Sequence, residues 1–302
     1  MSTLRSGTLR YGTCSWKFPS WKGLVYGAAE HINYLQEYAG RYRTVEVDQW
    51  FWSLFDTDSI SLPRTETVAE YSASVNDRFR FTIKAPNSIT LTHFYERGSQ
   101  RGSGPNPYFL SPELFADFLA RIEPLRDRTG CVILQFEYLN RRKMNGPAEF
   151  CERIDAFLSA VRARDCGWRL GIELRNGNYL GERYFRTLAG HGVPHVYCHG
   201  YYLPPAPEVY RRAVAALGPD LPGPAVLRLL GPDRSGIEEQ TGKRWNRIVA
   251  AKDEEFPRLV ETIEDMLERG LDVYVNVNNH YEGCAPLTIE KLERTTRSPE
   301  AP

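Results

Sequence analysis

An alternation of short apolar runs with segments of helical periodicity, repeated eight times, constrains the fold of this chain more than any other feature. Parallel strands need a crossover connection, usually a helix, so the alternation predicts a parallel sheet in an α/β fold. Eight such units favour closure into a single (β/α)8 barrel, or TIM barrel, formed by residues 1–302. An open doubly wound sheet is the alternative, but no GxGxxG motif follows the first run. The runs expected to form strands are Tyr11–Trp16, Thr44–Trp50, Phe79–Ala85, Cys131–Phe136, Arg169–Arg175, Pro194–His199, Ala225–Leu230 and Val273–Asn278.

Several helical segments carry recognisable ends. In SPELFADFLARIEPL, Ser111 is expected to cap the helix and Pro112 to occupy its first position. The segment FPRLVETIEDMLERG is expected to end at Gly270. Two long strand-to-helix connections, 94–110 and 231–250, are expected on the face where barrel enzymes build their sites. The tail is expected to fray from about residue 295.

Charge and cysteine usage narrow the choice of partner and compartment. Lys+Arg and Asp+Glu both number 38, so no overall charge favours nucleic acid or an anionic membrane. The chain contains no run of about 18 apolar residues and no apolar N-terminal stretch, so neither a membrane span nor a secretory signal is expected. The 6 cysteines are scattered and form no CxxC pair, which indicates reduced thiols in a cytoplasmic protein. The sequence does not indicate an oligomeric state.

Polar residues occupy one parity of several predicted strands. Because side chains alternate across a strand, the apolar parity is expected to face the helices and the other parity the barrel axis. In HVYCH, this interpretation places Val196 and Cys198 outward. It places His195, Tyr197 and His199 inward. The polar residues expected to point inward from the other strands are Glu46, Asp48, Thr82, Lys84, Gln135, Glu173, Arg175, Arg228, Asn276 and Asn278.

The inward set contains three carboxylates and three cations. Barrel interiors normally pack branched apolar side chains, and burying a charge is costly unless it is paired. One interpretation is an internally neutral ion-pair network that only satisfies itself. The preferred interpretation is a site for a small polar or anionic ligand at the C-terminal face, because a costly arrangement there has the better functional rationale.

Two of these carboxylates are the candidate catalytic residues. Glu46 and Glu173 lie on the inward parity beside cations, as a general acid or base would. A carboxylate paired with arginine has a lowered pKa, which suits a base or a ligand anchor better than an acid. Lys84 and Arg228 are expected to hold a carboxylate or phosphate, with Arg175 fixing Glu173. For each residue a structural ion pair is the alternative. Hydrolase, lyase and isomerase chemistry all fit such a carboxylate.

Further candidates stand at or beyond the strand ends. His93 precedes a long glycine-rich connection, and Asn279 and His280 follow the eighth strand. Trp16 and Trp21, together with two later tryptophans, could stack against a sugar ring or base, or could only pack over the barrel mouth. The complete predicted ligand-binding set is Asp48, Lys84, His93, Gln135, Arg175, His199, Arg228, Asn276, Asn278, Asn279, His280, Trp16 and Trp21.

Motifs spread along the chain resemble the YecE-like family, domain of unknown function 72. The matching segments are GTCSWKFPSWKGLVY (Gly12–Tyr26), YRTVEVDQWFW (Tyr42–Trp52), FTIKAPNSITLTH (Phe81–His93), LQF (Leu134–Phe136), IELRN (Ile172–Asn176), LRLLG (Leu227–Gly231) and VNNHYEGCAP (Val277–Pro286). Three segments depart from the family pattern: Leu230 replaces a histidine after the seventh strand, Asp48–Trp52 replaces Asn-Ser-Thr-Phe-Tyr, and Glu137-Tyr138 replaces a double proline. The resemblance implies a barrel similar to endonuclease IV and the sugar-phosphate isomerases, without an established activity.

The resemblance leaves two alternatives open. Endonuclease IV-like barrels bind divalent ions through histidines and carboxylates at strand ends, and the three inward cations would compete for that space. We therefore predict no metal and no cofactor, and keep a metal-dependent barrel as one alternative. The other is a nucleic-acid-binding barrel whose loops around Arg101 and Lys243 contact the backbone. Neutral net charge makes this alternative the less favoured one.

Overall fold

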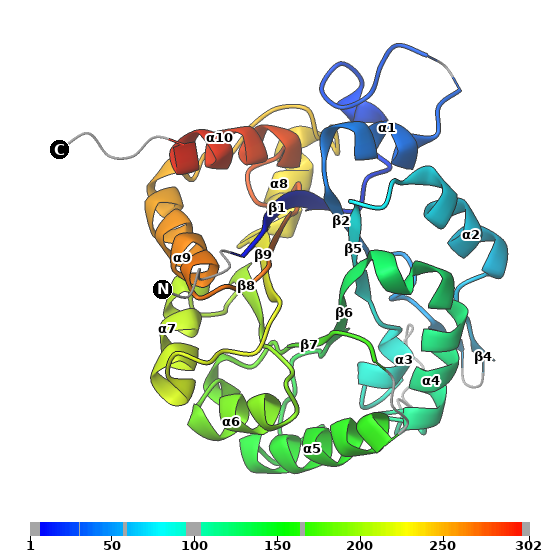
Figure 1. Cartoon of the computed structure of the whole chain (residues 1–302), viewed down its shortest axis with the longest axis vertical. Coiled ribbons are helices and arrows are strands. Elements are labelled where there is room, and N and C mark those ends of the chain that lie inside the picture. The colour runs from blue at the N-terminus through cyan, green and yellow to red at the C-terminus, as the bar shows by residue number, and fades with distance from the viewer. Residues whose placement is uncertain (1–6, 30, 57–58, 95–103, 164–166, 298–302) are drawn as a thin grey trace, which may run out of the picture.

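The structure is a computed structural model that describes residues 7–29, 31–56, 59–94, 104–163 and 167–297. Eight parallel strands form one sheet in the order β7-β6-β5-β2-β1-β10-β9-β8. The end strands meet where Ile172 N donates to Pro194 O at 3.0 Å, so the sheet curls into a near-closed barrel (Figure 1). The predicted (β/α)8 barrel is confirmed. Its strands are β1 (Leu9–Cys14), β2 (Thr44–Val47), β5 (Arg80–Lys84), β6 (Thr129–Gln135), β7 (Leu170–Glu173), β8 (Val196–Gly200), β9 (Ala225–Gly231) and β10 (Val273–Val277).

Helices alternate with these strands and surround them. Ser111 Oγ accepts a hydrogen bond from Leu114 N at 3.2 Å, which confirms the predicted cap of α4. Gly270 follows α9 with φ 79°, a conformation that glycine adopts without strain. The α-helices are α1 (Tyr34–Arg41), α2 (Thr65–Ser74), α3 (Asn87–Thr90), α4 (Pro112–Arg121), α5 (Pro147–Ala163), α6 (Glu182–Gly190), α7 (Ala206–Leu217), α8 (Arg234–Thr241), α9 (Phe256–Glu268) and α10 (Ala285–Arg297). Short 3-10 turns are η1 (Pro19–Trp21), η2 (Glu123–Arg128), η3 (Gly177–Tyr179) and η4 (Asp253–Glu255).

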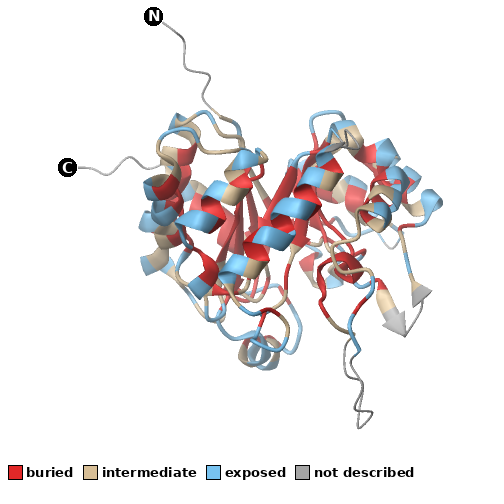
Figure 2. Cartoon of the chain, turned by 90° about the horizontal axis from the view of Figure 1, so that it is seen from below, coloured by how far each residue is buried: buried red, intermediate tan, exposed pale blue. Residues whose placement is uncertain are grey.

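Two apolar layers hold the barrel together. The outward side chains of the strands pack against the inner faces of the helices, whose outer faces are exposed (Figure 2). A smaller layer inside the barrel is apolar, and it comprises Cys131, Ile133, Val196, Val226 and Tyr274. This apolar layer fills the barrel interior toward the N-terminal ends of the strands, so the polar side chains lie nearer the C-terminal ends.

Three features differ from the expectations. An antiparallel hairpin of β3 (Leu54–Asp56) and β4 (Ser59–Ile60) follows β2 and was not predicted. The predicted loop 231–250 contains α8, which Asp233 caps through Gly236 N at 2.9 Å and Gly242 ends in a left-handed conformation. Helix α10 continues to Arg297, past the expected start of the tail near residue 295.

Some predictions fall on parts of the chain that are not described. Of the connection 94–110, residues 95–103 lie outside the described ranges, and with them Arg97 and Arg101. Five cysteines are buried and free, while Cys166 is not described. None of the helices in the described ranges combines the length and apolar character that a membrane span requires.

Candidate functional site

Arg228 crosses the barrel interior and binds two carboxylates from distant strands. Its Nε and Nη2 donate to the two oxygens of Glu46 at 2.6 Å each, and its Nη1 donates to Glu173 Oε2 at 2.5 Å. Gln135 Oε1 accepts a weaker bond from Nη1 at 3.2 Å. Both carboxylates are fully buried and Arg228 is 3% exposed. Charge-assisted bidentate pairs of this kind are strong and fix the geometry of both partners.

Arg175 extends this buried ion cluster, which comprises Glu46, Glu173, Arg175 and Arg228. Its Nη2 lies 2.5 Å from Glu173 Oε1, as the sequence predicted. Burial alone would raise the pKa of Glu173, but Arg175 and Arg228 outweigh burial and lower that pKa to about 2. The same two carboxylates keep the pKa of Arg228 well above its usual range, against the effect of burial. The cluster is therefore a charged but internally paired floor.

Lys84 and Asp48 stand apart from this pairing. The Lys84 ammonium lies 3.7 Å from the centroid of the Phe51 ring and has no ion pair with any described residue. Burial and the Arg228 charge lower the pKa of Lys84, against the attraction of nearby carboxylates. Burial and the Glu46 charge raise the pKa of Asp48. The predicted balance of three carboxylates against three cations thus holds in number, but only four of the six groups form ion pairs with residues in the described ranges.

A cavity of about 1010 Å³ opens beside the cluster, where β6, β7 and β8 end. Arg175 lies in its wall, and the guanidinium carbon is 4.7 Å from the centroid of the Tyr201 ring. The lining residues are Tyr138, Arg175, Gly177, Asn178, Tyr201, Tyr202, Leu203 and Pro204. Among them, only Arg175 was predicted from the sequence. Aromatic residues directly after strand ends were the available signal for the tyrosines.

The orientation predicted for β8 is wrong. Val196 belongs to the apolar layer inside the barrel, while His195 faces α6, where its Nδ1 lies 2.9 Å from Tyr184 Oη. Both alternating sets of side chains on this strand can be buried. Polarity alone therefore assigned the wrong set to the barrel interior. Burial lowers the pKa of His195 to about 4, so it packs there as a neutral ring.

His199 consequently does not join the buried ion cluster. Its Nδ1 accepts a hydrogen bond from Ala206 N at 3.2 Å, at the start of α7, and its Nε2 donates to Glu255 Oε2 at 2.8 Å. Tyr281 Oη donates to the same carboxylate oxygen at 2.6 Å. These bonds tie β8, α7, η4 and the segment after β10 together, which is a structural role.

The asparagines after and within β10 have separate partners. Asn276 Nδ2 donates to Thr82 Oγ1 at 2.9 Å inside the barrel, and its buried Oδ1 has no partner among the described residues. Asn279 Oδ1 accepts from Ala285 N at 2.9 Å and so caps α10. Asn278 Oδ1 accepts from His280 N at 3.0 Å. Asn276 thus lies inside the barrel as predicted, whereas Asn278 contacts His280 in its own turn.

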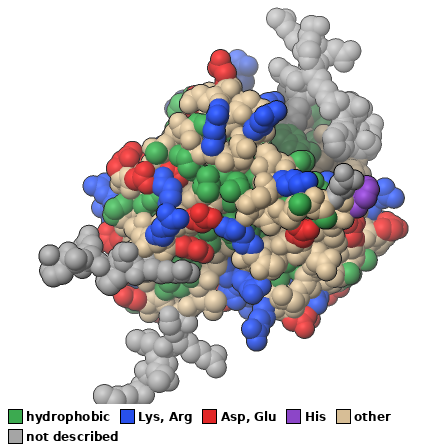
Figure 3. Space-filling model, turned by 90° about the horizontal axis from the view of Figure 1, so that it is seen from above, with side chains coloured by type: hydrophobic (Ala, Val, Ile, Leu, Met, Phe, Trp, Pro, Cys, Tyr) green, Lys and Arg blue, Asp and Glu red, His purple; other side chains and the backbone are tan. Residues whose placement is uncertain are grey.

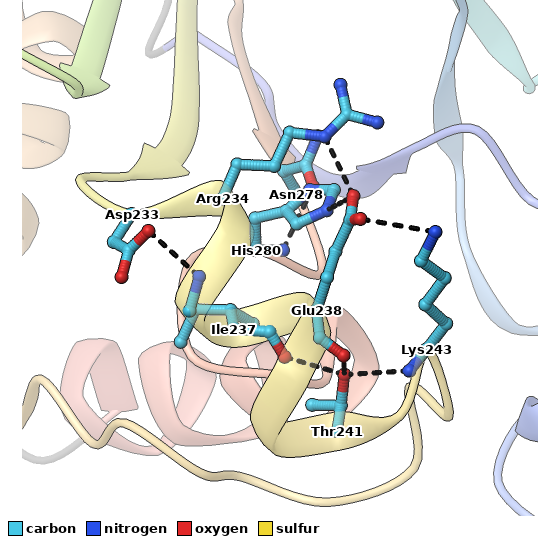
Figure 4. A network of polar contacts seen from close by, with 9 residues as sticks. Asp233, Arg234, Ile237, Glu238, Thr241, Lys243, Asn278 and His280 are labelled. Atoms are coloured by element: carbon cyan, nitrogen blue, oxygen red, sulfur yellow. Dashed lines mark hydrogen bonds and ion pairs between the residues drawn. The ribbon is translucent and has the colours of Figure 1, made fainter.

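His280 belongs to a network on α8 (Figure 4). Its Nε2 lies 3.0 Å from Glu238 Oε1, which also accepts from Arg234 Nε at 2.8 Å. Lys243 Nζ lies 3.3 Å from the other oxygen of Glu238. Burial lowers the pKa of His280, although Glu238 opposes this effect. The ring of His280 is therefore held between Asn278, whose Oδ1 lies 2.6 Å from Nδ1, and Glu238.

The first two tryptophans are core residues. Trp21 is fully buried and Trp16 is 5% exposed, the latter packing edge-on against Tyr71 at 5.1 Å between ring centroids. The stacking wall predicted for them does not form at the surface. Of the four tryptophans considered, Trp52 is the exposed one, at 56%.

His93 lies outside the ion cluster. Its Nδ1 lies 3.0 Å from Thr92 Oγ1, and it borders a separate cavity of about 370 Å³ together with Arg141, Lys143 and Arg153. Within the described ranges, no group of three or more His, Cys, Asp or Glu side chains is placed to hold a metal ion. The predicted absence of a metal stays a prediction.

The fold and the site together define a (β/α)8 barrel with a paired ionic floor and a cavity at the C-terminal ends of its strands. The chain belongs to the DUF72 family, described as "Protein of unknown function DUF72", which it matches over residues 10–301. A comparison with curated proteins gives no match.

Solved structures support this fold. A DUF72 family protein from Thermotoga maritima MSB8 has a TM-score of 0.65 and 20% identity, covering 96% of this chain and 100% of its own. A DUF72 family protein from Enterococcus faecalis V583 has a TM-score of 0.64 and 19% identity, covering 97% of both chains. A D-tagatose 3-epimerase-like protein has a TM-score of 0.52 and 14% identity, covering 95% of this chain and 96% of its own. At these identities the likeness shows the fold alone.

Proposed function

We propose that this barrel binds a small anionic ligand at the C-terminal ends of its strands, with Lys84 and Arg175 as the cations that hold it. The state of Lys84 carries the proposal, because this buried residue places its ammonium against Phe51 and has no ion pair with any described residue. A buried charge without a partner is costly, and an anion beside it would remove that cost. Arg228 does not serve this purpose because Glu46 and Glu173 already occupy its donors.

Asp48 is the group best suited to exchange a proton in this site. Burial and Glu46 raise the pKa of Asp48, and a carboxyl group with a raised pKa gives up its proton less readily than an arginine-paired one. Glu173, by contrast, is held ionised by two arginines. The proposal therefore assigns any proton transfer to Asp48, and gives Glu46 and Glu173 the role of fixing the arginines.

Two features support a small ligand over nucleic acid. Lys243, one of the predicted backbone contacts, is paired with Glu238. Acidic and basic side chains are interspersed on the face seen in Figure 3. A nucleic-acid-binding groove concentrates positive charge, because phosphate contacts supply most of its affinity.

Substitution of Lys84 by methionine tests the proposal. Without ligand, the Lys84→Met variant should be more stable than the wild type by about 1 kcal/mol in its free energy of unfolding, since a costly buried charge is gone. Its unfolding temperature should be higher accordingly. It should also lose the stabilisation that inorganic phosphate or acetate gives the wild type in thermal unfolding. Arg142→Met, which removes an exposed cation between β6 and α5, is the control and should respond to both anions as the wild type does. Lower stability together with unchanged anion response in Lys84→Met would refute the proposal.

A further inference from the structure

The exposed aromatic side chains of this protein are concentrated at the strand ends. Among the described residues, four large hydrophobic side chains are exposed, and all four are aromatic: Trp52, Tyr138, Tyr201 and Tyr202. Each follows the C-terminal end of a barrel strand, and the three tyrosines line the cavity that contains Arg175. Exposed apolar groups gathered around a cavity mark a binding surface more often than scattered ones do.

The backbone holds Tyr201 in a conformation that a bulky residue rarely adopts. Its φ is 55°, in the left-handed region, where an aromatic residue costs about 1 kcal/mol or more. Tyr201 N donates to Gly231 O at 3.0 Å, and the pairing of β8 with β9 shifts register just before it. A Cβ atom on Gly200 would lie 2.5 Å from Gly231 O, so only glycine permits this close approach. The bulge and the glycine contact therefore direct the chain at Tyr201 toward the cavity.

Arg175 and Tyr201 form a stacked pair in the cavity wall. The guanidinium carbon lies 4.7 Å from the ring centroid, and Glu173 fixes the other side of the guanidinium at 2.5 Å. The wall thus combines a positive charge held in place with flat ring faces. Its volume, about 1010 Å³, is at the upper end of typical pockets for small organic ligands.

We propose that this cavity is a subsite for a flat aromatic ring attached to the anionic group of the ligand. The ring stacks among Tyr138, Tyr201 and Tyr202, and the carboxylate or phosphate lies toward Arg175. The inference rests on the proposed anion binding and adds to it the class of ligand: an aromatic or heteroaromatic carboxylate or phosphate. Stacking of a flat ring on aromatic side chains supplies enough free energy to raise affinity by roughly tenfold per ring.

Three probes that differ in one feature each can test the subsite. Inorganic phosphate, phenyl phosphate and cyclohexyl phosphate are titrated calorimetrically into the wild-type protein. Phenyl phosphate should bind roughly tenfold more tightly than inorganic phosphate. Cyclohexyl phosphate has a ring of the same carbon count that is not flat, so it should bind more weakly than phenyl phosphate.

Variants of the cavity tyrosines show which side chains produce the preference for phenyl phosphate. Tyr201→Asn removes the ring, and asparagine tolerates the left-handed backbone, so the fold should be retained. Tyr201→Asn and Tyr138→Ala should bring phenyl phosphate close to the affinity of inorganic phosphate while leaving inorganic phosphate unchanged. Trp52→Ala, which removes an exposed aromatic side chain that does not line the cavity, should keep the preference of the wild type.

The outcomes separate this inference from the proposed function. If inorganic and phenyl phosphate bind with equal affinity, or if Tyr201→Asn keeps the preference for phenyl phosphate, the ring subsite is refuted and anion binding stands. Equal affinity for phenyl and cyclohexyl phosphate would refute the aromatic class. If neither inorganic nor phenyl phosphate binds, both the subsite and the proposed function are refuted.

Discussion

Removal of Arg228 should lower the free energy of unfolding, because two buried carboxylates lose the cation that neutralises them. In Arg228→Met, Glu173 keeps Arg175 as a partner, whereas Glu46 has no other ion pair with a described residue and stays fully buried. Leaving a buried charge without its partner costs about 3–5 kcal/mol. Since domains unfold at a cost of roughly 5–15 kcal/mol, the variant should be only marginally stable at neutral pH.

A second substitution should restore much of this loss. In Arg228→Met/Glu46→Gln the unpaired carboxylate is replaced by a neutral amide, so we expect at least half of the lost stability to return.

Urea unfolding followed by tryptophan fluorescence measures these differences. Arg212→Met is the matched control, because Arg212 pairs with Glu208 along one helix with side chains 42% and 41% exposed. An exposed pair of this kind contributes less than about 0.5 kcal/mol. The reasoning fails if Arg228→Met costs less than about 1 kcal/mol, or if Glu46→Gln brings no recovery.

Three further predictions concern other parts of the site. Because the pKa of Glu173 is lowered from 4.5 to about 2, its pairing should contribute about 3 kcal/mol above pH 4.5 that is lost as the pH falls to 2; acid unfolding of Glu173→Gln should lack this dependence. His199→Ala should lose about 1–2 kcal/mol by urea unfolding, since its bonds to Ala206 and Glu255 are absent, but should bind inorganic phosphate as the wild type does. Protein purified without a metal-affinity column should carry substoichiometric zinc, manganese and iron by elemental analysis, and one equivalent of a metal held by Asp48 would contradict this.

The barrel could be predicted from sequence because its signals are local. Each strand is a short apolar run between turns, and several helices carry a capping residue of their own, so all eight predicted strands are found. The β3–β4 hairpin was missed because it follows β2 without a turn signal strong enough to separate it. The β8 orientation failed because Tyr184 on a neighbouring helix satisfies His195, and no local pattern reveals that partner.

The candidate site was only partly predictable for a related reason. Strand alternation correctly predicted that Glu46, Glu173 and Arg228 all point into the barrel, because alternation depends on each strand alone. Which of the six charges are paired depends on distances across the barrel, so the sequence could not separate Lys84 from the arginines. The positions of Tyr201 and Tyr202 in the cavity depend on the loop after β8, where Gly200 approaches Gly231 of β9 closely.

Some charges of the site are paired with one another and others are left to interact with a ligand. Two arginines and two glutamates neutralise one another, so the floor contributes little net charge and holds its geometry. The net charge of the site is then decided by Lys84 and Asp48, and the two groups respond to a bound anion in the same direction. An anion nearby raises the pKa of each, because it stabilises the ammonium and disfavours the carboxylate. Anion binding and proton uptake are therefore linked in this site, and affinity should rise as the pH falls through the range in which either group titrates.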